Sequence, residues 1–175
     1  MRSVLDLNID MGESVDRWCH GDDRELLRVA SSVNVCTGAY AGTLELIAET
    51  CFEAVTHGVR IGAQVGYRDP DGFGRRPVEI STTDLQSEIA AQLDQLASLA
   101  AEAGGQIAYV KPHGALYHRV HHDPAQAEGL LAAIHAHDEN LLLMGMPEAT
   151  SLEMAHQLGL GAILEGEVQQ RRQHH

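Results

Sequence analysis

The sequence has 175 residues, the length of one sizeable domain, and no apolar run approaches the roughly 18 residues that cross a bilayer. Its 25 acidic residues outnumber its 12 basic residues, and the resulting formal net charge of −13 disfavours contact with the phosphates of nucleic acids. The opening Met1-Arg2-Ser3 leads into charged residues and not into an apolar signal sequence. These features predict a soluble, cytoplasmic protein that binds neither membrane nor nucleic acid.

Short apolar runs alternate with longer amphipathic runs along the chain. The runs predicted as strands are, in order, Val4–Ile9, Val33–Thr37, Val59–Gln64, Ile107–Lys111, Leu141–Met144 and Ala162–Leu164. The segments predicted as helices are Asp22–Ala30, Leu44–Thr56, Thr83–Ala103, Pro124–His137 and Glu148–Leu158. Strands that alternate with helices indicate right-handed βαβ units and a parallel sheet. Because a full barrel has eight strands, we predict an α/β fold that resembles a parallel (β/α) barrel, incomplete or distorted, with about six to seven strands.

The chain shows no internal repeat and no linker. Residues 1–165 are therefore predicted to form a single domain, and residues 166–175 a polar tail. The long connection Gly66–Pro77 is rich in Gly, Pro, Asp and Arg, and connections of that length are often functional. Cys19, Cys36 and Cys51 are odd in number and unpatterned, which fits a reducing compartment and neither a disulfide framework nor a zinc ribbon.

Polar clusters occur where two of the predicted strands end. Lys111-Pro112-His113-Gly114-Ala115-Leu116-Tyr117 follows the apolar run Ile107–Val110, and Lys111 is the single lysine of the sequence. The second cluster, Asp6-Leu7-Asn8-Ile9-Asp10-Met11-Gly12-Glu13, opens the chain. Side chains at the carboxyl ends of parallel strands converge on ligands. Strand alternation also places Asp6, Asn8 and Asp10 on one face, which points inward in a barrel, so the two clusters predict an active site.

Three further motifs accompany these clusters: Asn34 with Gly38-Ala39-Tyr40-Ala41-Gly42, Ile61-Gly62-Ala63-Gln64-Val65-Gly66-Tyr67, and Gly72-Phe73-Gly74-Arg75-Arg76. Together the five motifs resemble the LamB/YcsF family, to which the A subunit of 5-oxoprolinase belongs, from about Val4 to about Leu164. The resemblance implies a barrel-like β/α fold related to sugar and polysaccharide deacetylases. It also implies a hydrolase that takes part in the ATP-dependent opening of the lactam 5-oxoproline to glutamate, with ATP supplied through partner subunits.

The chain departs from the family pattern at two motifs and near its end. The family has a histidine followed by Ala-Gly-Asp-Pro where this chain has Tyr40, Thr43 and Leu44. It has Ala-His-Pro-Gly where this chain has Gln64-Val65 in place of the His-Pro pair. After Glu165 the family continues with Phe-Ala-Asp-Arg and further barrel elements, whereas this chain has Glu167-Val168-Gln169-Gln170 and then a short remainder. Two of the three expected imidazoles are thus replaced.

The predicted catalytic residues are Asp10, Lys111 and His113. His113 would protonate the ring nitrogen of the lactam, Asp10 would activate or orient water, and Lys111 would stabilise the developing negative charge. The predicted substrate-binding residues are Asp6, Asn8, Glu13, Tyr40, Gln64, Arg75 and Arg76.

Several of these residues also have a structural interpretation. A carboxylate such as Asp6 or Asp10 can cap a turn, and Lys111 can form an inward ion pair with either of them. His113 can be a core histidine bonded to a carbonyl, and the two arginines can be surface charges. We interpret His118, His121 and His122 as a solvated surface cluster before the helix at Pro124, and place Trp18 in the loop after the first strand.

No metal is predicted. Asp10 and His113 supply about two ligands, below the three protein ligands typical of a catalytic zinc site, and Tyr40 and Gln64 are poor replacements for imidazoles. Two alternatives to the hydrolase therefore stay open. One is a divergent, metal-free acid/base tailoring enzyme of a specialised pathway, with Tyr40 as a proton donor. The other is a non-catalytic subunit. The expected partners are a small-molecule substrate, the 5-oxoprolinase partner subunits and, as an open alternative, further copies of the chain.

Overall fold

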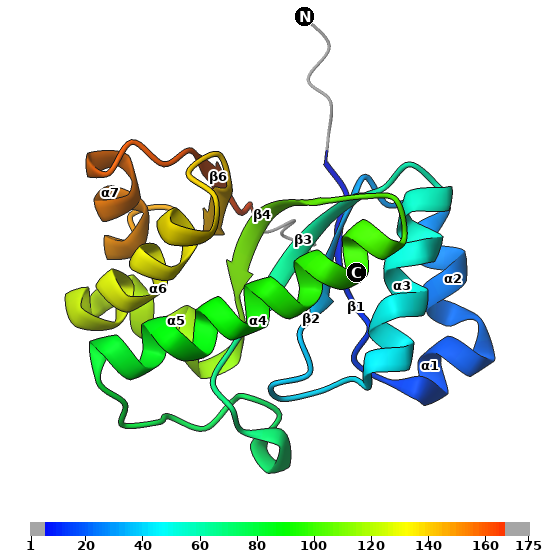
Figure 1. The fold of residues 1–175 in the computed structure, drawn as a ribbon, viewed down its shortest axis with the longest axis horizontal. Helices are drawn as coiled ribbons and strands as arrows, with labels where there is room; N and C mark the ends of the chain where they lie inside the picture. Colours follow the sequence, from blue (N-terminus) through cyan, green and yellow to red (C-terminus); the bar gives the residue numbers. More distant parts are fainter. Residues whose placement is uncertain (1–5, 167–175) are drawn as a thin grey trace, which may run out of the picture.

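The computed structural model describes residues 6–166 and contains one sheet whose six strands lie side by side in chain order, all parallel. The sheet curls into a half-barrel with helices on its outer side (Figure 1), which confirms the predicted fold class. The strands are β1 (Asn8–Met11), β2 (Ser32–Cys36), β3 (Arg60–Val65), β4 (Ile107–Pro112), β5 (Leu142–Gly145) and β6 (Ala162–Leu164). Within residues 6–166 no helix is both long and apolar enough to cross a membrane.

The helices of this part of the chain follow the strands in βα order. They are α1 (Val15–His20), α2 (Asp22–Leu27), α3 (Leu44–Thr56), α4 (Thr82–Glu102), α5 (Gly114–His122), α6 (Pro124–His137) and α7 (Thr150–Gln157), with a single 3-10 turn, η1 (Pro70–Gly72). Side-chain caps fix several starts: Thr43 accepts a hydrogen bond from the Leu46 amide, and Ser81 accepts one from the Asp84 amide. These caps explain why the predicted starts of α3 and α4 agree with the structure to within one residue.

The structure corrects the sequence interpretation in three places. Strand β1 begins at Asn8, because pairing with β2 and not apolarity sets its start, and Asp6 and Leu7, which were predicted as strand, precede it. Val4 and Leu5 lie outside the described residues, as do residues 167–175 of the predicted tail. Trp18 lies in helix α1 and is buried, not in a loop. Helices α1 and α5 were not predicted. His118, His121 and His122, which were placed before a helix, stand on α5, where His118 and His122 are exposed as expected but His121 is half-buried, with its Nδ1 buried.

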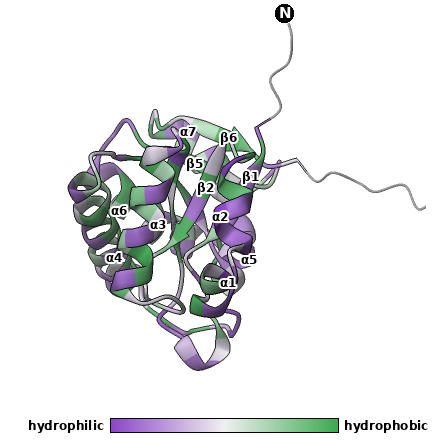
Figure 2. Ribbon diagram, turned by 90° about the vertical axis from the view of Figure 1, so that its right-hand side faces the viewer, coloured by the Kyte–Doolittle hydropathy of each residue, from purple (hydrophilic) through white to green (hydrophobic). Residues whose placement is uncertain are grey.

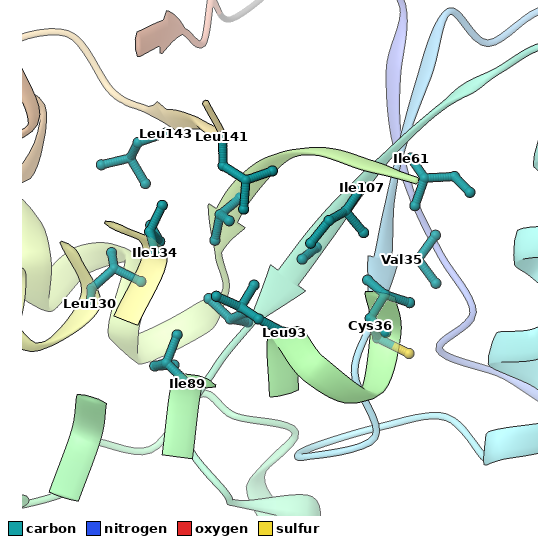
Figure 3. Close-up of a cluster of buried hydrophobic side chains, with 14 of the residues drawn as sticks. Val35, Cys36, Ile61, Ile89, Leu93, Ile107, Leu130, Ile134, Leu141 and Leu143 are labelled. Carbon is teal, nitrogen blue, oxygen red and sulfur yellow. The ribbon is translucent and has the colours of Figure 1, made fainter. Parts of the chain in front are cut away.

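The hydrophobic core lies between the sheet and the helices that cover its outer face. Ile89 and Leu93 of α4 pack there with strand residues such as Ile61 and Ile107 and with Leu130 of α6 (Figure 3). The helices carry hydrophobic and hydrophilic residues on different faces (Figure 2), as expected for amphipathic helices over a core. This packing holds the strands in place, so the residues that follow them are presented at fixed positions.

Two segments close the end of the half-barrel where the strands terminate. The connection from Gly66 to Ile80, with η1, projects at the lower edge of Figure 1, and α5 begins directly after β4. A 2.9 Å hydrogen bond from the Ala115 amide to the Gly74 carbonyl joins this connection to α5. A Cβ at Gly114 would lie 2.3 Å from that carbonyl oxygen, and Gly114 has φ +57°, so both the contact and the backbone require glycine.

Candidate active site

A pocket of about 330 Å³ opens at the carboxyl ends of the strands, where the sequence predicted the site. Predicted residues from three strands reach it: Asp10 from β1, Gln64 from β3 and Lys111 from β4, with His113 directly after β4. The other lining residues are Pro112, Gly114, Tyr117, His118, Met146, Glu165 and Gly166. The first and fourth strands lie apart in the sheet, so it is the curl of the sheet that brings Asp10 and Lys111 to one pocket.

Lys111 is held between two carboxylates. Its Nζ lies 2.7 Å from Glu165 Oε1 and 3.5 Å from Asp10 Oδ1, and its side chain is 13% exposed. The Tyr117 hydroxyl donates to Glu165 Oε2 at 2.5 Å, which fixes the carboxylate that anchors the lysine. The predicted alternative of an ion pair with Asp10 is therefore present. The same contacts hold a cation at the wall of the pocket, where it can meet a ligand.

His113 is half-enclosed by aromatic rings and bonded to the backbone. Its ring stacks on Tyr40 with centroids 4.1 Å apart, and its Nε2 lies 2.9 Å from the Phe73 carbonyl oxygen. A carbonyl only accepts, so Nε2 carries a proton and Nδ1 is the basic nitrogen of the neutral ring. Burial lowers the pKa of His113 below its ordinary value of 6.5, against a smaller opposing contribution from the Phe73 carbonyl. His113 is thus a neutral imidazole near pH 7 that can take up a proton at Nδ1.

Tyr40 and Gln64 occupy the positions of the two replaced imidazoles, and they lie beside His113. The Tyr40 hydroxyl donates to Gln64 Oε1 at 2.8 Å and also lies 3.1 Å from the Gln64 carbonyl oxygen. Both side chains are 1% exposed, and Gln64 lines the pocket whereas Tyr40 packs behind it. Burial raises the pKa of Tyr40 well above 10, which keeps the phenol protonated. Tyr40 therefore orients the Gln64 amide that faces the pocket.

The inward face of the half-barrel below the pocket is filled by a polar network. Asn34, fully buried, donates to Asn8 Oδ1 at 2.6 Å and to Asp10 Oδ1 at 2.7 Å. The Tyr109 hydroxyl donates to Asn34 Oδ1 at 2.8 Å, and Asn8 donates to the Tyr109 oxygen at 2.8 Å. Asp6 accepts from Ser32 and from Arg60 at 2.9 and 2.6 Å. Asn8 is thus connected to Asp10 through Asn34, whereas Asp6 is held by Ser32 and Arg60, and neither Asp6 nor Asn8 lines the pocket.

Of the remaining predicted residues, Glu13 lies near Asp10, whereas Arg75 and Arg76 belong to the connection after β3. Glu13 lies close enough to Asp10 for their charges to interact; burial first, and then Asp10, raise the pKa of Glu13 above 4.5. Arg75 stands over the Phe73 ring, its guanidinium carbon 5.2 Å from the ring centroid. Arg76 forms an ion pair with Asp69 inside the connection after β3. Arg76 lies outside the lining of the pocket, and its contacts assign it to the structure of that connection.

Glu165, Tyr117, His118 and Met146 line the pocket but were not selected from the sequence. Glu165 follows β6 directly, and a carboxylate at a strand end was the same signal that singled out Asp10. Tyr117 belongs to the motif after β4, but its role depends on Glu165, 48 residues further along the chain. The contacts of Glu165 with Lys111 and with Tyr117 depend on the register of β6 beside β5 and on the start of α5, which the sequence alone does not give.

The donor set around His113 bears on metal binding. Within residues 6–166 no group of three or more His, Cys, Asp or Glu side chains is arranged to hold a metal ion. The absence of a metal stays a prediction, and it rests on chemistry: glutamine is a weak neutral ligand, and the Tyr40 phenol would have to lose a proton that burial retains.

We expect purified protein to carry no stoichiometric transition metal, and chelator to leave its activity unchanged. The double variant Tyr40→His/Gln64→His is the matched comparison, because it places two imidazoles beside His113. It should bind zinc at about one ion per chain while the wild-type chain does not. Elemental analysis after dialysis measures both. One tightly held metal per wild-type chain, removable only with loss of function, would overturn this expectation.

Comparison with known proteins places these residues in a family. A model of the LamB/YcsF family matches residues 5–173. The chain is 43% identical over 162 residues to the A subunit of 5-oxoprolinase from Streptomyces avermitilis and 44% identical over 163 residues to that from Mycolicibacterium gilvum. Each alignment covers 93% of this chain and 65% of the relative, so the chain spans about 65% of the length of these relatives.

A solved structure agrees with this placement. The lactam utilization protein of Thermus thermophilus superposes with a TM-score of 0.87 at 35% sequence identity, over 93% of this chain and 66% of that one. The match of the family model over nearly the whole chain confirms the resemblance seen in the five motifs. The chain belongs to the LamB/YcsF family.

Proposed function

We propose that this chain is a 5-oxoprolinase-type hydrolase subunit that opens a small cyclic amide, with 5-oxoproline as the substrate. The observation that carries the proposal is the placement of the Lys111 cation and the neutral His113 on the wall of one pocket of about 330 Å³. That volume lies at the small end of the usual range for ligand sites, roughly 300 to 1,000 Å³. The names of the relatives, the A subunit of 5-oxoprolinase and lactam utilization protein, support the substrate class.

The chemistry follows from the protonation states. Opening the ring requires a proton on the leaving nitrogen, a nucleophilic oxygen on the carbonyl carbon and stabilisation of the negative charge on the carbonyl oxygen. His113 accepts a proton from water at Nδ1 and, as imidazolium, passes it to the ring nitrogen when the C–N bond breaks. Lys111 stabilises the oxyanion, and Asp10 orients the water. In this scheme His113 keeps its predicted role as the proton donor, but it must act as the base first.

Activation by ATP would come from partner subunits. The resemblance implies such partners, and the relatives are themselves named as one subunit of an enzyme, which supports an assembly. ATP would transfer a phosphoryl group to the amide oxygen, with release of ADP, which makes the carbonyl carbon more electrophilic. After water adds and the C–N bond breaks, the remaining acyl phosphate would be hydrolysed by a second water to glutamate and phosphate, and Lys111 would stabilise the phosphorylated intermediate in place of the oxyanion. The residues of this chain would then hold the substrate, orient water and move the proton.

The direct test is glutamate release from 5-oxoproline and ATP by the purified chain mixed with cognate partner subunits. The full-length A subunit of a 5-oxoprolinase serves as the positive control, because this chain spans about 65% of such relatives. The proposal predicts glutamate release that depends on ATP and on this chain. No turnover, in an assay where the full-length control works, would reject it.

The Tyr40–Gln64 pair favours a second candidate, a divergent member of the family with another substrate. Neutral hydrogen-bonding groups replace imidazoles there, and the Tyr40 phenol stays protonated. A thermal-shift screen of cyclic amides would identify the ligand, and neighbouring genes that belong to a biosynthetic cluster would favour this candidate over oxoprolinase partners. A non-catalytic subunit is the third alternative. It gains support if partner binding survives in the wild type and in His113→Gln and no reaction is detected with either.

The pH dependence of the reaction reports on His113. The neutral imidazole is the active form and its pKa is lowered, so kcat/KM should hold down to about pH 6.5 and fall only as the pH drops through that lowered pKa. His113→Gln keeps a donor for the Phe73 carbonyl but lacks a base, so we expect roughly 10²–10⁴-fold slower turnover and no acid limb. Profiles of both proteins from about pH 5 to about pH 9 measure this. An unchanged acid limb in the variant would exclude His113 as the base.

A further inference from the structure

A second pocket, of about 310 Å³, adjoins the first and is not used by the proposed reaction. Its wall contains Arg75 from the connection after β3, and His118, Arg119 and His122 from α5. His118 lines both pockets and therefore forms the boundary between them. In a chain with a net charge of −13, every charged or titratable side chain that lines this pocket, Tyr67 apart, is basic.

The two arginines of the pocket differ in their partners. Arg119 is neutralised, with its Nε 2.6 Å from Asp123 Oδ2 and its Nη1 3.5 Å from Glu79 Oε1. For Arg75, no carboxylate of residues 6–166 lies within 4.0 Å of the guanidinium nitrogens. Its neighbour Arg76, by contrast, is held by Asp69. Arg75 is thus the arginine of this pocket that forms no ion pair within the described chain, although the Glu13 carboxylate lies near enough for the two charges to interact.

The backbone that carries Arg75 is held in position. The Arg75 amide donates to the Gly72 carbonyl at 3.0 Å. The carbonyl of the preceding residue, Gly74, accepts a hydrogen bond from the Ala115 amide of α5. The Arg75 guanidinium lies over the ring of Phe73, and the backbone carbonyl of Phe73 accepts the hydrogen bond from His113. These contacts tie the arginine to the residues of the first pocket. A guanidinium without an ion-pair partner presents a planar fork of donors that matches two oxygens of an oxyanion.

The two histidines complete the anion-binding character of the pocket. His118 and His122 are four residues apart on α5, and they therefore stand on the same face of the helix, exposed to the solvent. An imidazole can donate from a ring nitrogen to an oxyanion in either of its charge states. Tyr67 adds no free donor, because its hydroxyl bonds Gln126 Oε1 at 2.8 Å and forms the floor.

We propose that the second pocket is an oxyanion-binding site in which Arg75 is the principal ligand-binding residue and His118 and His122 assist. The oxyanion would be a carboxylate or a phosphoryl group, either on a ligand that reaches past His118 from the first pocket or on a separate molecule. The inference concerns binding alone, so it stands or falls independently of the reaction proposed above.

The test titrates inorganic phosphate and, separately, acetate at constant ionic strength, and follows the His122 imidazole signal by NMR. His122 lines the second pocket and not the first. We expect a saturable displacement of this signal, with the exposed His20 of α1 as an internal control for non-specific effects. Arg75→Gln should raise the Kd at least about tenfold, the effect of losing a charge-assisted pair of hydrogen bonds. Arg28→Gln, which removes the same charge on the distant α2 end, should leave it unchanged.

Each outcome decides the inference. Displacement by phosphate that Arg75→Gln weakens supports a phosphoryl site, and displacement by acetate with the same dependence supports a carboxylate site. No saturable displacement by either anion, or displacement equally strong in Arg75→Gln, overturns the proposal. Arg75→Lys keeps the charge without the fork and should bind with intermediate affinity. This second variant keeps the test valid if thermal unfolding shows that Arg75→Gln disturbs the fold.

Discussion

Replacing Lys111 with methionine should lower kcat/KM for glutamate release by about 10²–10³-fold, the usual loss when one donor to an oxyanion is removed. Methionine keeps much of the length of the side chain but cannot stabilise negative charge on the substrate. It also leaves Asp10 and Glu165 facing the pocket without the cation that lies 3.5 and 2.7 Å from them. The added negative field opposes the developing oxyanion, so the loss should fall mainly on kcat.

Glu165→Gln is the companion variant, because it removes the charge that anchors Lys111 and keeps the lysine. The Tyr117 hydroxyl can still donate to the amide oxygen of the new side chain. We expect a smaller loss, about tenfold, since the part of Glu165 in the proposed reaction is to position the cation. Arg28→Gln controls for net charge. If Lys111→Met retained wild-type kcat, Lys111 would be only the structural ion pair that the sequence left as an alternative.

The largest expected effect on stability comes from Gly62→Ala in β3. A Cβ at Gly62 would lie 2.1, 2.2 and 2.6 Å from three atoms of the Tyr109 ring, which is fully buried. The ring cannot move away easily, because its hydroxyl is bonded to Asn8 and Asn34. Overpacking of this kind should lower the free energy of unfolding by about 3 kcal/mol or more. Urea unfolding of both proteins measures it.

Two comparisons separate the clash from other effects of adding a methyl group. At Gly104, with φ +85°, an added Cβ meets nothing within 4 Å, so Gly104→Ala should lose only the 1–2 kcal/mol or so of left-handed backbone strain. In the background of Tyr109→Ala, the Gly62 substitution should become much less destabilising, because the ring is gone. Equal effects of Gly62→Ala in both backgrounds would show that the close approach of Tyr109 does not explain the glycine.

The sequence was sufficient for the elements whose signals are local. The βα alternation predicted all six strands and five of the helices, because apolar runs, Pro124 at a helix start and the serine before α4 are read within a few residues. Helix α5 was missed because it follows β4 through the Pro112-His113-Gly114 turn and has no side-chain cap. The contact of Gly114 with Gly74, which fixes that start, is a tertiary one.

The site shows the same division. Strand-end position and residue chemistry were enough to select Asp10, Lys111 and His113, and the family resemblance added Gln64; these four residues line one pocket. They could not show that the Nε2 proton of His113 is already used by the Phe73 carbonyl, since Phe73 is 40 residues away. Nor could they distinguish Arg75 from Arg76, because the difference lies in which of the two meets Asp69. Long-range contacts decide the roles, and composition at strand ends decides only the candidates.

The central claim is that the pocket around Lys111 binds the cyclic amide, and Lys111 itself provides the measurement. It is the single lysine of the sequence, so protein labelled with ¹³C at lysine Cε gives one side-chain signal from the site. Titration with 5-oxoproline should displace that signal saturably, and the displacement should be absent with proline, which lacks the lactam carbonyl. An unmoved lysine signal in a preparation that releases glutamate with its partner subunits would contradict the account.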